Sequence, residues 1–150
     1  MNAVCRALAL FPDRMDTPQA RVMIGAIQRQ EDPRMLRRQM GNGPARGLYQ
    51  FERLGGVFGV MRHAATRAMA RHLCAVREVE FASEAIWSAL EFDDVLAAGF
   101  ARLLLWSDPF ALPAIDDAAG GWALYMRTWR PGKPHARKWA KNHADAVDDL

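Results

Sequence analysis

The spacing of apolar and polar positions along the chain predicts a domain built mainly from helices. The clearest amphipathic segment is residues 17–31, where Thr17 followed by Pro18 is a typical helix start. Its apolar positions follow the i, i+3, i+4, i+7 spacing of a stripe that faces a core: Ala20, Met23, Ile24 and Ile27. We expect this helix to end near Glu31, because Asp32 precedes a proline and is disfavoured in the helical region.

Glu31 interrupts that apolar stripe. It follows Ile27 by four residues and Ile24 by seven, where the pattern requires an apolar side chain. Burial disfavours the charged form of a carboxyl, and the negative end of a helix dipole acts in the same direction. We therefore expect a raised pKa for Glu31, as a general acid needs near neutral pH.

Five further helices are predicted beyond this segment. Three of them cover about residues 64–76, 84–91 and 94–106, with Ser83 and Asp93 as N-caps of the last two. Another begins after Asp116 or Asp117 and carries an aromatic stripe at helical spacing, and a polar helix starts near residue 137. Together they predict an all-α fold of about six helices, in a single domain with residues 1–16 as a lead-in and residues 17–140 as the core.

Residues 32–47 do not fit a regular element. They contain three glycines, two prolines and four arginines, which are Arg34, Arg37, Arg38 and Arg46. This composition predicts an irregular basic loop. The apolar run that follows, Leu48 to Phe51, is either one brief strand or a turn against the core.

Length and composition restrict the class of protein. A chain of 150 residues is long enough to bury a core in one domain, and 51% hydrophobic with 25% charged residues is ordinary for a globular protein. No apolar run approaches the ~20 residues of a membrane span. The first residues lack a basic opening and a cleavage site, so we expect no secretory signal.

Neither cysteine nor histidine predicts a metal site or a cofactor. Cys5 and Cys74 are far apart and fit no metal or redox spacing, and the four histidines show no i, i+4 pairing. The net charge is +3, but residues 1–80 hold thirteen arginines against seven acids, whereas residues 81–150 carry more acids than bases. The positive half contains Glu31, which favours a polyanionic substrate or partner.

Two segments resemble the lysozyme-like superfamily, in its lytic transglycosylase and goose-type lysozyme branch. In that family a catalytic glutamate ends a helix in a Gln-Glu-Ser context, and a Gly-Leu-Met-Gln turn forms one wall of the cleft. Here the matching residues are Gln30-Glu31-Asp32 and Gly47-Leu48-Tyr49-Gln50. Residues 101–109 and 122–132 are similar to phage-encoded members. Three departures are Asp32 in place of serine, Tyr49 in place of methionine, and no clear copy of the family's Ala-Tyr-Asn motif.

The resemblance implies a set of site residues. Glu31 would be the catalytic acid and base, and Gly47, Leu48, Tyr49, Gln50 and Tyr125 would bind substrate or contact Glu31. Glu52 or Asp108 would supply the second carboxylate that a hydrolase requires, whereas a transglycosylase needs none. The opposing interpretation is that a loop arginine pairs with Glu31, which would lower the pKa of its carboxyl and prevent acid catalysis.

The function implied is cleavage of peptidoglycan glycan strands by a lytic transglycosylase or muramidase, without cofactor or metal. The setting implied is a phage particle or lysis system that acts on the periplasmic wall, with other virion proteins as further partners. The alternative is a virion protein that keeps the fold as an assembly or wall-binding module without activity. The segment 129–139 mixes tryptophans with cations, but it matches no nucleic-acid motif of defined spacing.

Overall fold

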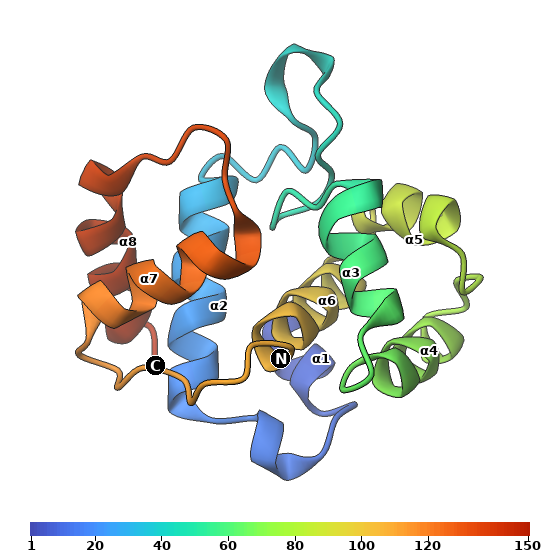
Figure 1. The fold of residues 1–150 in the computed structure, drawn as a ribbon, viewed down its shortest axis with the longest axis horizontal. Coiled ribbons are helices and arrows are strands. Elements are labelled where there is room, and N and C mark those ends of the chain that lie inside the picture. Colours follow the sequence, from blue (N-terminus) through green and yellow to red (C-terminus); the bar gives the residue numbers. More distant parts are fainter.

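The computed structural model describes residues 1–150 and contains eight α-helices and no β-strand (Figure 1). The all-α class predicted from the sequence is therefore confirmed. The helices are α1 (Ala3–Leu8), α2 (Pro18–Glu31), α3 (Phe58–Arg62), α4 (Arg67–Val76), α5 (Ser83–Leu90), α6 (Asp94–Trp106), α7 (Ala118–Trp129) and α8 (Ala136–Asp148). Short 3₁₀ turns occur at Asp13–Met15 and Met40–Asn42, and a π-helical turn at Arg53–Val57 precedes α3.

All six predicted helices are present, and the two with the clearest caps have the predicted bounds. In α2 the Thr17 hydroxyl accepts the N–H of Ala20, and in α6 the Asp93 carboxylate accepts the N–H of Leu96. The two helices that were not predicted, α1 and α3, have only six and five residues. Such short segments carry too few apolar positions for a helical period to be recognised in the sequence.

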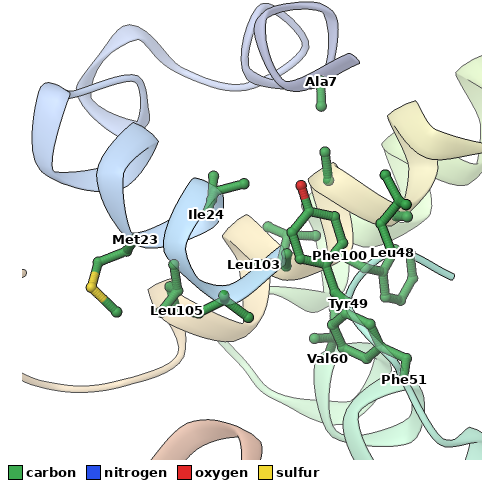
Figure 2. Packing of buried hydrophobic residues seen from close by; sticks show 14 of the residues in the cluster. Ala7, Met23, Ile24, Leu48, Tyr49, Phe51, Val60, Phe100, Leu103 and Leu105 are labelled. Atoms are coloured by element: carbon green, nitrogen blue, oxygen red, sulfur yellow. The ribbon is translucent and has the colours of Figure 1, made fainter. Parts of the chain in front are cut away.

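Helix α6 is the centre of the core. Every residue from Val95 to Leu103 is buried, and the helix contacts α1, α2, α3, α4, α5 and α7. An α-helix surrounded in this way is expected to be apolar on nearly all sides, and the one charged residue of this buried stretch is Arg102. Figure 2 shows Phe100 and Leu103 of α6 among apolar side chains from α1, α2, α3 and the segment Leu48–Phe51.

Helix α2 lies between α6 and α8 and contacts both (Figure 1). Helix α7 packs on both α8 and α6. The Trp139 indole of α8 is buried, and its N–H donates to the Ala118 carbonyl at the start of α7, 2.7 Å away. These contacts fix α7 beside the end of α2, where Glu31 lies.

None of the helices combines the length and the apolar character that a membrane span needs.

Candidate active site around Glu31

Glu31 is the last residue of α2, and its side chain is mostly enclosed by protein. Its Oε1 accepts a hydrogen bond from the Tyr125 hydroxyl at 2.6 Å. Burial raises the pKa of Glu31 to about 7, and the bond from Tyr125 opposes that shift in part. No other hydrogen bond or ion pair reaches the carboxyl, so Oε2 has no partner within the chain.

Tyr125 is held by aromatic packing. It is buried on α7, and its ring stacks on Trp139 with the centroids 5.3 Å apart and the planes 13° apart. Trp122 and Trp129 flank it from the same helix. Burial and then the charge of Glu31 raise the pKa of Tyr125 far above its ordinary value, so the hydroxyl stays protonated and acts as a donor. The contact between Tyr125 and Glu31 is therefore present, while the ring itself belongs to the core.

The loop arginines do not pair with Glu31. Arg37 makes a bidentate pair with Asp94, with both distances 2.7 Å, and Arg38 pairs with Glu91 at 2.9 Å. Arg46 lies 3.6 Å from the same Glu91 carboxylate and covers the Trp87 ring. Arg34 is exposed and makes no ion pair. Because three of the four guanidinium groups are engaged by Glu91, which directly follows α5, and by Asp94 of α6, no cation offsets the burial of Glu31.

Asp32 organises the loop that leaves the site. Its carboxylate is buried and accepts the backbone N–H groups of Leu36 and Arg37 at 2.9 and 2.7 Å. Met35 and Arg37 adopt left-handed backbone conformations, with φ of 54° and 61°. Such conformations cost about 1 kcal/mol or more for residues other than glycine. The two hydrogen bonds to Asp32 thus hold a strained reversal directly after Glu31.

The segment after the loop is a turn and not a strand. Arg46 and Phe51 exchange both backbone hydrogen bonds at 2.9 Å and enclose the four residues Gly47–Gln50. Gly47 has a φ of 79°, and a Cβ at that position would lie 2.7 Å from the Leu90 carbonyl oxygen. Glycine is therefore required here for its conformation and for its lack of a side chain.

Within this turn only Gln50 keeps a partly exposed side chain, whereas Leu48 and Tyr49 are buried in the core (Figure 2). The expectation that the Tyr49 side chain forms part of a cleft wall is therefore wrong: the ring fills the space between α6 and the turn. The Gln50 amide donates to the Gly47 carbonyl at 3.0 Å and makes no hydrogen bond to Glu31. The Tyr49 carbonyl accepts the indole N–H of Trp129 at 2.9 Å. This bond joins the turn to α7 one helical turn beyond Tyr125.

Neither candidate for a second carboxylate contacts Glu31. Glu52 is exposed beside the turn. Asp108 is held by Arg127 at 2.8 and 3.0 Å, and it lines a pocket together with Thr17 at the opposite end of α2. A helix of 14 residues separates that end from Glu31 by about 20 Å. Asp108 is thus excluded as a partner of Glu31 in one reaction.

Trp129 and Trp139 are the site residues that sequence analysis did not identify. The sequence contains a signal for Trp129, because it follows Tyr125 by four residues on one helix face. Trp139 falls within the polar helix predicted from about residue 137, and in the structure it lies in α8 and stacks on Tyr125. Nothing in the local sequence indicates that contact, which depends on how α7 and α8 pack.

No group of three histidine, cysteine, aspartate or glutamate side chains converges as a metal site would require. Comparison of the chain with known protein families, with curated proteins and with solved structures finds no match.

Proposed function

We propose that this chain is a lysozyme-like enzyme that cleaves peptidoglycan glycan strands, with Glu31 as acid and base. The bond would be the β-1,4 link between N-acetylmuramic acid and N-acetylglucosamine. The observation that carries the proposal is the Glu31 carboxyl, which is enclosed, free of cations and has a pKa of about 7. A glycosidic oxygen leaves readily only when it is protonated. An acid with a pKa near ambient pH both gives and recovers that proton efficiently.

The hydrogen bond from Tyr125 assigns roles to the two carboxyl oxygens. Since Oε1 accepts the phenolic proton, the carboxyl's own proton resides on Oε2. Oε2 then donates its proton to the glycosidic oxygen as the bond from C1 to that oxygen breaks. The 6-hydroxyl of the muramic acid residue attacks C1, and its proton passes to Oε2. The enzyme returns to its starting state, and the product carries a 1,6-anhydro ring.

The transglycosylase course is favoured over hydrolysis because no second carboxylate is available beside Glu31. Asp32 is occupied by two backbone N–H groups, and Asp94 by Arg37. A hydrolase of the retaining or inverting type requires a second carboxylate roughly 5 to 10 Å from the first. Glu52, exposed near the turn, is the only one of the two predicted candidates that remains.

The test is incubation of the purified chain with purified peptidoglycan, followed by mass spectrometry of the released fragments. We expect anhydro-ended fragments from the wild type, none from Glu31→Gln, and an unchanged yield from the matched variant Glu52→Gln. Reducing ends together with loss of activity in Glu52→Gln would show a two-carboxylate hydrolase. A folded wild type that releases no fragments would refute the proposed enzymatic activity.

A second candidate, a wall-binding or assembly module without activity, is favoured by the apolar surface of the loop after Glu31. Met35, Leu36 and Met40 are 50%, 52% and 72% exposed. The setting in a phage particle or lysis system belongs to either proposal and rests on the resemblance of residues 101–109 and 122–132 alone. Sedimentation of an inactive wild type with peptidoglycan would support this second candidate.

A further inference from the structure

A pocket of about 500 Å³ lies at the N-terminal end of α2, far from Glu31. Its walls come from the first turn of α2, the last turn of α6, the 3₁₀ turn Asp13–Met15 and the loop 108–112. In Figure 1 this is the end of α2 that joins the 3₁₀ turn, opposite the end at which α2 meets the loop 32–50. Sites for small molecules have volumes of about 300 to 1,000 Å³. The pocket is therefore large enough for a small molecule.

The unusual member of this wall is Arg102. Its side chain is almost fully buried, with a residue exposure of 2%. Its Nε donates to the Met15 carbonyl at 2.8 Å, but no carboxylate pairs with it and the buried Nη1 has no hydrogen-bond partner. A guanidinium has five N–H donors, and buried polar groups without partners are rare in folded proteins. Arg102 is thus a buried cation that lines a pocket with most of its donors unused.

Two neighbouring groups also carry hydrogen-bond donors that no acceptor of the chain uses. The Arg14 guanidinium makes no ion pair and lies over the Trp106 ring, 5.8 Å from its centre, while Arg102 lies 5.1 Å from the same ring. In the first turn of α2 the Ala20 N–H is taken by Thr17, but the Gln19 N–H has no acceptor within the chain. The pocket therefore offers hydrogen-bond donors and positive charge.

The one carboxylate that lines the pocket, Asp108, does not neutralise the positive charge of Arg102 and Arg14. Both oxygens of Asp108 accept from the Arg127 guanidinium. Asp16, which is also nearby, makes a bidentate pair with Arg21 at 2.7 Å. The remaining lining is largely apolar and includes Leu105, Trp106 and Leu112. A matching ligand has an anionic head and an apolar body.

We propose that this pocket binds a small organic carboxylate, with the anion on Arg102 and Arg14 and the apolar body against Trp106. Planar guanidinium groups recognise carboxylates through paired hydrogen bonds. The bound anion would pair with the part of the Arg102 guanidinium that lines the pocket. The proposal uses no property of Glu31 and stands or fails independently of the peptidoglycan activity.

The test is calorimetric titration of the full chain with phenylacetate, with its neutral counterpart phenylacetamide, and with inorganic phosphate. We expect saturable binding of phenylacetate and at least about tenfold weaker binding of phenylacetamide, since a hydrogen bond to a charged group contributes that much. We expect phosphate, which lacks the apolar body, to bind more weakly than phenylacetate. Absence of phenylacetate binding, equal affinity for phenylacetamide, or tighter binding of phosphate would each overturn the proposal.

Variants locate the site. Arg14→Gln removes an exposed arginine of the wall, and we expect about tenfold weaker binding of phenylacetate. Arg6→Gln removes the same charge from exposed surface of α1 and should leave the affinity unchanged. Arg102→Met should abolish binding in a chain whose circular dichroism matches the wild type. If Arg102→Met does not fold, the comparison of Arg14→Gln with Arg6→Gln decides, and equal affinities in those two variants would refute the assignment.

Discussion

The hydrogen bond between Tyr125 and Glu31 allows the environment of the carboxyl to be measured directly. Tyr125→Phe removes the hydroxyl that lies 2.6 Å from Oε1 and leaves the ring to stack on Trp139. The hydroxyl stabilises the ionised carboxylate, so its loss should raise the pKa of Glu31. Activity, where present, should extend to higher pH in the variant, because the acid keeps its proton longer.

The size of the effect follows from the kind of bond. A hydrogen bond to a charged group contributes about 1.5 to 3 kcal/mol, and a difference of one pKa unit corresponds to about 1.4 kcal/mol. Relaxation around the missing hydroxyl and entry of water reduce the difference toward the lower limit. We therefore expect the pKa of Glu31 to rise from about 7 to about 8 in Tyr125→Phe.

Carbon NMR of protein labelled at the glutamate side-chain carboxyl measures this titration, with Glu31→Gln to identify the resonance. The matched control is Tyr49→Phe, which removes the only other tyrosine hydroxyl, also buried, but one that does not bond to Glu31. We expect the Glu31 titration to be the same in the control and in the wild type. A pKa in Tyr125→Phe that equals or lies below the wild-type value would refute the assigned hydrogen bond.

Three further predictions concern stability. Because the folded state binds the Glu31 proton more tightly than the unfolded chain, the stabilisation from Glu31 is complete below about pH 4.5 and is lost as pH rises through about 7. The free energy of unfolding of the wild type relative to Glu31→Gln, measured by urea titration, should therefore fall by at most about 3 kcal/mol between pH 4 and pH 8. A difference that stays constant over this range would contradict the prediction. Gly47→Ala should lower the free energy of unfolding by about 2 to 4 kcal/mol, because the added Cβ meets the Leu90 carbonyl oxygen. Gly41→Ala, at a φ of 73° with open space around it, should lower it by only about 1 kcal/mol. Equal losses of stability in thermal unfolding would show that the contact with Leu90 is not rigid. Asp32→Ala should lower the free energy of unfolding by about 2 to 4 kcal/mol and speed amide hydrogen exchange at Leu36 and Arg37. Asp32→Asn keeps one acceptor oxygen and should lose less stability. Unchanged exchange rates would refute the role of Asp32.

The parts of the fold that the sequence predicts are those that depend on local chemistry. The bounds of α2 and α6 follow from caps within three residues, Thr17 with Ala20 and Asp93 with Leu96. The unusual position of Glu31 also follows from spacing along one helix. These features involve neighbours in sequence, so residue type and spacing are sufficient to recognise them.

The parts that the sequence does not predict depend on contacts between distant segments. Tyr49 has the polar handle of a cleft residue, but the turn directs its ring into the core beside Phe100 (Figure 2). The loop arginines were an open question because their partners, Asp94 and Glu91, follow Arg37 and Arg38 by more than fifty residues. Only the packing of α5 and α6 beside the loop determines which acid each arginine meets.

The pairing of the loop arginines with Asp94 and Glu91, together with the role of Asp32, accounts for the raised pKa of Glu31. A mostly enclosed carboxyl keeps a raised pKa when nearby cations are engaged elsewhere and the helix ends without leaving the carboxyl fully in water. Asp94 and Glu91 engage the arginines, and Asp32 reverses the chain within a few residues of Glu31. The serine usual at this position in the resembled family is replaced here by a carboxylate that binds two backbone N–H groups at once. In this chain the departure from that pattern therefore supports the enclosure of Glu31 and does not disrupt it.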